Sequence, residues 1–295
     1  MKLSQNIIVL SQLVLASASS PFALRGNAHY NEEDAPSNAD AVDEGSDDNI
    51  TQYHSLWHDV QLRPMSAELT QQDNIINFAV EIPLKLRAKM EMQKTLPGNP
   101  IKQDRFDDGS ARFYSYGDPF FNYGFVPQTW EDPELTDALG NGGDNDPLDI
   151  MEVGSQQLAM GSVVPSRVLG ALTLIDEGQM DNKIIVISLS DPDADKIYDL
   201  DDLETIKPGM IDRLVDWLKM YKTTDGMPEN ELVSDVPVGI PDAIEIINET
   251  HGAWVKMCET GDDHGQGFWL AAAGCQGTTP PPNPQNDAEP SVETM

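Results

Sequence analysis

Basic residues are scarce in this chain of 295 residues, which has 18 lysines and arginines against 50 aspartates and glutamates, a formal net charge of −32. Nucleic acids and anionic membrane surfaces are polyanions, so this charge disfavours both as partners. A small anionic substrate would also be repelled unless metal ions or a local group of cations neutralised it. Phosphate chemistry on this chain would therefore depend on divalent cations, although the same acidity would also suit a protein adapted to salty surroundings.

Cysteines and long apolar runs are scarce as well. The two cysteines, Cys258 and Cys275, cannot form a disulfide framework, but they could pair in an oxidising compartment. Beyond the first residues no apolar run approaches the roughly 18 residues of a membrane span, so no membrane association is expected. The histidines, His58 and His251 among them, are scattered singly, which favours structural roles. No cluster of Cys and His residues indicates zinc.

The chain divides into four segments by composition. Residues 1–18 contain a lysine, a short apolar run and a small-residue cleavage pattern, as a secretory signal peptide does. Residues 19–50 form an acidic arm and residues 271–295 a Pro-rich acidic tail, both predicted to be disordered. Residues 51–270 form the folded domain. We expect export to the extracellular space, with the lumen of a plastid or vacuole as the alternative; use of the glycosylation sequons at Asn49 and Asn248 is left open.

Within the folded domain the sequence predicts strands first and helices late. Apolar, β-branched runs predict the strands, whereas apolar residues at three- and four-residue spacing after a proline predict the helices. Short strands between acidic loops favour a small barrel, so the expected class is mainly β with flanking helices (α+β). The predicted strands cover residues 74–83, 84–92, 166–176 and 182–191, and the predicted helices cover 208–222 and 241–258.

Aspartates gather in two of the loops. Asp144, Asp146 and Asp149 lie within the segment GDNDPLD, and Asp176 and Asp181 follow in IDEGQMD. Crowded carboxylates repel one another unless cations lie between them, and hard oxygen ligands suit Mg²⁺, Mn²⁺ or Ca²⁺. In a chain this acidic, a solvated loop is the competing interpretation. The scarce cations Lys89, Arg112, Lys183 and Lys222 stand among these acids, and with the hydroxyls of Tyr123 and Tyr221 they could bind phosphate.

Six blocks together resemble the soluble family I inorganic pyrophosphatases, in order and in spacing. The blocks are VEIP, KMEM, NYGFVPQTWEDP, GDNDPLDIMEVG, ALTLIDEGQMDNK and YKTTDGMPEN, and SLWHDVQL resembles the amino-terminal extension of the eukaryotic branch. The resemblance covers about residues 51–258. It implies a five-stranded OB-type β-barrel and hydrolysis of pyrophosphate to two orthophosphates with several Mg²⁺ ions, Mn²⁺ being an alternative.

The resemblance also implies a role for each matching residue. Asp146 would be the general base for a metal-activated water. Asp144, Asp149, Asp181, Asp176 and Glu91 would bind the metal ions, and Glu81 would support the site. The substrate phosphates would be bound by Lys89, Arg112, Tyr123, Lys183, Tyr221 and Lys222.

The sequence departs from the family at Pro119, where many relatives carry a tyrosine; Tyr114 and Tyr116 are the candidates to supply that hydroxyl. Leu84 and Lys85 replace a pair associated with dimer contacts, so a homodimer is left open. The alternative function is a catalytically silent, secreted, acidic protein that binds divalent cations on the same scaffold. Retention of Asp146 and of the cations favours the enzyme.

Overall fold

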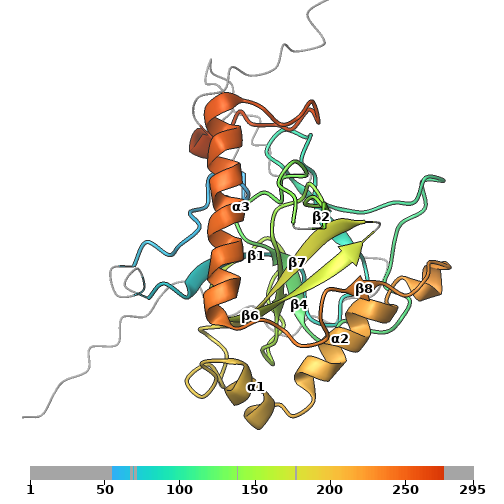
Figure 1. The fold of residues 1–295 in the computed structure, drawn as a ribbon, viewed down its shortest axis with the longest axis vertical. Coiled ribbons are helices and arrows are strands. Elements are labelled where there is room, and N and C mark those ends of the chain that lie inside the picture. The colour runs from blue at the N-terminus through green and yellow to red at the C-terminus, as the bar shows by residue number, and fades with distance from the viewer. Residues whose placement is uncertain (1–54, 67–68, 70–71, 138, 177, 276–295) are drawn as a thin grey trace, which may run out of the picture. The chain divides into compact units, whose positions relative to one another are not determined.

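The computed structural model describes residues 55–275, apart from residues 67–68, 70–71, 138 and 177. The expected signal peptide, the acidic arm, Asn49 and the tail beyond residue 275 lie outside the described residues. The described part is mainly β, with its helices towards the carboxyl end of the chain, as the sequence predicts (Figure 1).

Five strands form a closed ring in the order β1-β4-β5-β7-β6, because β6 pairs with β7 on one side and with β1 on the other. β8 adds to the free part of β6, and β2 and β3 form a separate hairpin. The pairing of β5 with β7 is parallel, and the other pairings are antiparallel. This ring agrees with the expected five-stranded core. The strands are β1 (Ile75–Ile82), β2 (Met90–Met92), β3 (Ile101–Gln103), β4 (Asn122–Phe125), β5 (Asp149–Glu152), β6 (Val163–Asp176), β7 (Gln179–Ser188) and β8 (Glu231–Leu232).

The predicted strands are found with shifted ends. β6 and β7 form a hairpin in which Asp176 is opposite Gln179, and the turn uses Gly178 at a φ of +86°, which glycine adopts without strain. The prediction of a strand from residue 84 to 92 is wrong for its first six residues. There the chain turns after Pro83, with the N–H of Leu86 bonded to the carbonyl of Pro83 at 2.9 Å. Lys85 is left-handed at a φ of 70°, so the strand begins only at Met90.

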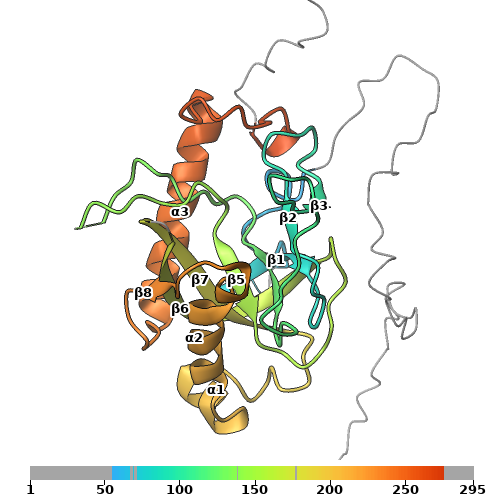
Figure 2. The same cartoon turned by 90° about the vertical axis from the view of Figure 1, so that its right-hand side faces the viewer.

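The helices are α1 (Leu200–Ile206), α2 (Met210–Met220) and α3 (Ile240–Thr260), with short 3₁₀ helices at Thr223–Asp225 and Ala273–Cys275. Both predicted helices match, and α3 packs along β6 while α1 and α2 adjoin each other (Figures 1 and 2). α1 was not predicted from the sequence, although Asp199 caps it by accepting from the N–H of Asp202 at 2.9 Å. Among the described helices, none has both the length and the apolar character that crossing a membrane requires.

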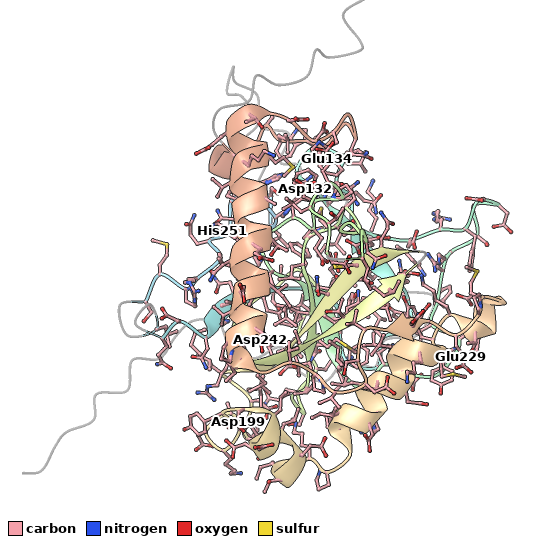
Figure 3. All side chains as sticks on the ribbon, in the orientation of Figure 1. Asp132, Glu134, Asp199, Glu229, Asp242 and His251 are labelled. Atoms are coloured by element: carbon pink, nitrogen blue, oxygen red, sulfur yellow. A yellow bond between two sulfur atoms is a disulfide. The ribbon has the colours of Figure 1, made fainter. Side chains whose placement is uncertain are left out.

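The end of α3 is tied to the amino-terminal part of the domain. His58 is fully buried, stacks on Trp57 at a centroid distance of 4.2 Å and accepts at Nδ1 from Nε1 of Trp254 at 2.9 Å. Cys258 and Cys275, left open by the sequence, form a disulfide beside it. His251, one turn before Trp254, lies with its ring Nδ1 2.7 Å from the carbonyl oxygen of Gln128 (Figure 3). These contacts support the structural roles expected for both histidines.

The buried imidazole of His58 is expected to make stability depend on pH. Burial lowers the pKa of His58 from 6.5 to about 4. Between about pH 6.5 and pH 4 this histidine is therefore protonated in the unfolded chain but neutral in the folded protein. Stability is lost as the pH falls through that range. The shift corresponds to a loss of about 3 kcal/mol in the free energy of unfolding.

Urea unfolding of the wild type and of His58→Asn, at several pH values between 7 and 4, measures this loss. The asparagine keeps an acceptor near the position of Nδ1 but does not titrate. The difference in unfolding free energy between wild type and variant should therefore narrow by about 3 kcal/mol as the pH falls from 7 to 4. His251→Asn, on the half-buried face of α3, is the matched control. Parallel pH curves for wild type and His58→Asn would contradict the prediction.

Candidate active site

All thirteen side chains singled out by the sequence line one cavity of about 240 Å³. They come from segments more than 140 residues apart in the chain, which the ring of strands and α2 bring together. Seven of them are carboxylates and four are cations, so the lining has an excess of three negative charges when every group is ionised. The carboxylates are Glu81, Glu91, Asp144, Asp146, Asp149, Asp176 and Asp181; the others are Lys89, Arg112, Lys183, Lys222, Tyr123 and Tyr221.

The pairing of β5 with β7 sets the centre of the cavity. Asp149 is the register partner of Lys183, and Asp181 precedes Lys183 by two residues on β7, so the three side chains lie on one face of the sheet. The Lys183 ammonium forms ion pairs with both carboxylates. It also donates to the hydroxyl of Tyr123 at 2.9 Å, and that hydroxyl donates to Asp149 at 2.6 Å. The side chain of Lys183 is only 4% exposed, so this charge is buried.

The charges at this centre influence one another strongly. Burial opposes the charge on Lys183, but Asp149 and Asp181 outweigh it and raise the pKa of the ammonium well above its usual value. Burial also raises the pKa of Asp149 to about 7, an effect that Lys183 opposes and Asp181 reinforces. One buried ammonium therefore does not neutralise the carboxylates around it, and an additional cation would be stabilised here.

The loop that carries Asp144 and Asp146 is fixed against the segment around Glu131. A Cβ on Gly143 would lie 2.4 Å from the backbone of Glu131, so only glycine fits at the start of the GDNDPLD segment. The backbone N–H of Asn145 donates to the backbone carbonyl of Glu131 at 2.9 Å. In return, the backbone N–H of Glu131 donates to the backbone carbonyl of Asp146 at 2.8 Å. Asn145 is left-handed at a φ of 72°, a conformation that asparagine tolerates. The close approach explains the glycine of the motif, and the left-handed backbone explains the asparagine.

Glu131 is a member of the site that the sequence analysis missed. One of its carboxylate oxygens, Oε1, accepts from the side chain of Asn182 at 2.7 Å, whereas the buried Oε2 has no hydrogen-bond partner among the described residues. One carboxylate oxygen from each of Glu131, Asp144 and Asp181 lies within 4.8 Å of the other two. Burial and mutual repulsion raise the pKa of Glu131 and of Asp144 well above the usual values. Buried oxygens that converge and repel fit a hard divalent cation.

Two of the cations, Lys89 and Arg112, are held by Asp104, a second residue that the sequence did not indicate. Lys89 donates to the Asp104 carboxylate at 2.9 Å and Arg112 donates to the same oxygen at 2.7 Å. Lys222 forms an ion pair with Asp176. Each cation is thus held near the cavity by a carboxylate. Such anchoring reduces the conformational freedom that would be lost when an anion binds.

Two further carboxylates of the cavity lie at β2. Glu81 lies on β1 and accepts from the N–H of Met92 at 2.7 Å; burial, with Asp149 and Glu91, raises its pKa well above the usual value. Glu91 lies on β2, 3.4 Å from the ammonium of Lys89. Burial raises the pKa of Glu91 as well.

The structure separates the two tyrosines that could replace the hydroxyl missing at Pro119. Tyr114 lines the cavity and packs edge-on against Tyr221, with ring centroids 6.0 Å apart. Tyr116 instead donates its hydroxyl to Asp216 at 2.8 Å on the surface of α2. Of the two, only Tyr114 is in a position to reach a substrate in the cavity.

Comparison with known proteins identifies the family. The protein-family model described as "Inorganic pyrophosphatase" matches residues 78–255. The inorganic pyrophosphatase of Mus musculus is 41% identical over 234 residues, covering 77% of this chain and 76% of that protein. The soluble inorganic pyrophosphatase 6, chloroplastic, of Arabidopsis thaliana is 41% identical, covering 72% of this chain and 68% of that protein. The solved inorganic pyrophosphatase of Schistosoma japonicum superposes with a TM-score of 0.68 at 38% identity, over 73% of this chain and 76% of that one. The chain belongs to the inorganic pyrophosphatase family.

Proposed function

We propose that this protein hydrolyses inorganic pyrophosphate to two orthophosphates with the help of magnesium ions, and that the activity resides in the folded domain of residues 51–270. The observation that carries the proposal is the single cavity in which seven carboxylates face four anchored cations. A site for a neutral or cationic substrate would not need the cations. A simple store of divalent cations would not need them either.

The carboxylates divide into two groups that suit different ions. Asp144, Asp149 and Asp181, with Glu131 beside them, would hold the ion at the centre of the cavity. Glu91, on β2, and Asp176, at the end of β6, would hold the ions that enter with the substrate. When bound, such ions would acidify water and screen the charge of pyrophosphate. All of these ligands are oxygens, which suits Mg²⁺ or Mn²⁺ better than zinc.

The remaining side chains would bind the substrate and take up the proton of the attacking water. Four cations, Lys89, Arg112, Lys183 and Lys222, would each donate to phosphate oxygens, with the hydroxyls of Tyr123 and Tyr221 as further donors. Asp146 would accept the proton of the attacking water, for which a carboxylate suffices once that water is acidified. Holding both phosphates in line with the water would supply a large share of the rate enhancement.

Release of orthophosphate by the purified full-length protein tests the proposal. We expect turnover of pyrophosphate with MgCl₂, none with EDTA in its place, and at least about 100-fold lower kcat/KM with ATP. Magnesium binding without turnover would show the catalytically silent protein instead. Comparable rates on ATP and pyrophosphate would show a broad phosphatase.

We propose that the protein works in an oxidising compartment of the secretory pathway. The disulfide between Cys258 and Cys275 supports this, because disulfides are rare in reducing compartments. The chloroplastic name of the Arabidopsis relative makes an organelle the alternative. Sequencing the mature amino terminus separates them: a start near Ser19 with protein in the medium supports export, and cleavage well past residue 40 with organelle retention contradicts it.

A further inference from the structure

Lys94 has no role in the function proposed so far, yet it contacts the proposed general base. It follows β2 by two residues, outside the group of side chains that line the cavity. Its ammonium donates to the backbone carbonyl of Asn145 at 2.8 Å and forms an ion pair with the carboxylate of Asp146. One side chain therefore contacts two successive residues of the loop that supplies the base.

The backbone of Lys94 is itself held in place from the opposite side. Its carbonyl accepts from the side chain of Asn99 at 2.9 Å and from the backbone N–H of Trp269 at 2.8 Å. The Lys94 ammonium also lies over the ring of Phe268, 5.5 Å from the centroid. The side chain is 22% exposed, so its position is set by these neighbours more than by water. Lys94 thus joins the segment after α3 to the catalytic loop.

The segment that carries Phe268 and Trp269 is anchored at both ends. The Cys258–Cys275 disulfide ties its last residue back to α3. Near its start, ring Nε2 of His264 lies 2.9 Å from the carboxylate of Asp132. Figure 3 shows Asp132 beside this segment at the carboxyl end of α3. The support behind Lys94 is therefore a fixed part of the fold.

The catalytic loop needs such support. Asn145 is left-handed, and the side chain of Asp146 is 33% exposed at the edge of the cavity. The Lys94 ammonium contacts both the carbonyl of Asn145 and one carboxylate oxygen of Asp146. Without that ammonium the carboxylate could turn away from the cavity, and a displacement of about 1 Å can lower a rate about 100-fold.

We propose that Lys94 is a positioning residue for pyrophosphate hydrolysis, which fixes the Asn145–Asp146 backbone and aims the Asp146 carboxylate into the cavity. The inference rests on the proposed function, because it concerns the base of that reaction. It adds a residue that acts through Asp146 and does not touch the substrate. Loss of Lys94 should therefore lower kcat more than it changes KM.

Three variants of the full-length protein test this in the orthophosphate assay with saturating MgCl₂. In Lys94→Met, kcat should fall about 10- to 100-fold with KM within about threefold of wild type. Lys94→Arg keeps a charged donor and should restore kcat to within about fivefold. Lys256→Met removes the same charge from the exposed face of α3 and should leave both constants unchanged.

Hydrogen exchange of the protein without metal supplies a readout independent of turnover. Amides in a peptide covering residues 143–149 should exchange at least about tenfold faster in Lys94→Met than in wild type or Lys256→Met. Should Lys94→Met fail to fold, Lys94→Gln is measured in its place.

Unchanged kcat in an active protein, a raised KM at constant kcat, no restoration by arginine, or unchanged exchange would each overturn the inference. A wild type that releases no orthophosphate would instead contradict the proposed function. The exchange rates would then still decide whether Lys94 holds the loop.

Discussion

Replacing Asp146 with asparagine is expected to lower kcat for pyrophosphate by about 1,000-fold while the fold persists. The amide has the shape of the carboxylate but cannot accept the proton of the attacking water. Asp146 is proposed for this role because it lines the cavity but does not belong to the convergent set formed by Glu131, Asp144 and Asp181. The backbone bond from Asp146 to the Asp144 carboxylate, 2.9 Å long, does not involve the altered group. Initial rates over a range of pyrophosphate concentrations give kcat and KM separately.

Asp242→Asn is the matched control, since Asp242 is exposed in the first turn of α3 (Figure 3) and does not line the cavity. It should keep wild-type kcat. Two results would contradict the role of Asp146: a loss of less than about tenfold, or recovery of the activity of Asp146→Asn at higher MgCl₂, which would make Asp146 a metal ligand. General-base assistance contributes typically 10²–10⁴-fold, so a smaller loss would fall outside the expected range.

The sequence predicted the long elements of the fold better than the short ones. β1, β6, β7, α2 and α3 have strong apolar patterns and are found near their predicted positions. β4 and β5 have four residues each and lie inside the motifs, where the residue types serve the cavity as well as the strand. Their place in the ring depends on register with distant strands, which no local pattern encodes.

The site residues that the sequence identified all line the cavity, whereas Glu131, Asp104 and Lys94, which it missed, contact or adjoin residues of that lining. Glu131 was overlooked although it lies within the quoted block NYGFVPQTWEDP, because one acid between aromatic and acidic neighbours has no local signal. The scarcity of cations that drew attention to Lys89 and Lys183 applied equally to Lys94. Its partner Asp146 is 52 positions away, so only the folded structure shows the contact. Asp104 was missed for the same reason, since it acts on Lys89 and Arg112 and not on the cavity.

Replacing Lys183 with methionine is expected to have the second large effect, on stability as well as on activity. The ammonium is buried between Asp149 and Asp181, and its loss leaves buried carboxylates without their compensating charge. Removing one partner of a buried ion pair costs about 3–5 kcal/mol, so the free energy of unfolding without metal should fall by about that amount at pH 8. Millimolar MgCl₂ should restore part of it, because a bound cation takes over the compensation. Urea unfolding with EDTA and with MgCl₂ measures both values.

An exposed ion pair serves as the control that separates the effect of burial on stability from the effect of losing one positive charge. Lys196 contacts Asp193 at 2.8 Å, but its side chain is 56% exposed, so Lys196→Met should cost less than about 1 kcal/mol and respond little to MgCl₂. Turnover of Lys183→Met should fall at least about 100-fold even with saturating MgCl₂, because the cation restores charge but not the donor to the phosphate and to Tyr123. If the two variants lost equal stability without metal, Lys183 would not be compensating buried charge. The carboxylates would then have to be largely protonated in the metal-free protein, and cation binding would have to displace those protons before the site could form.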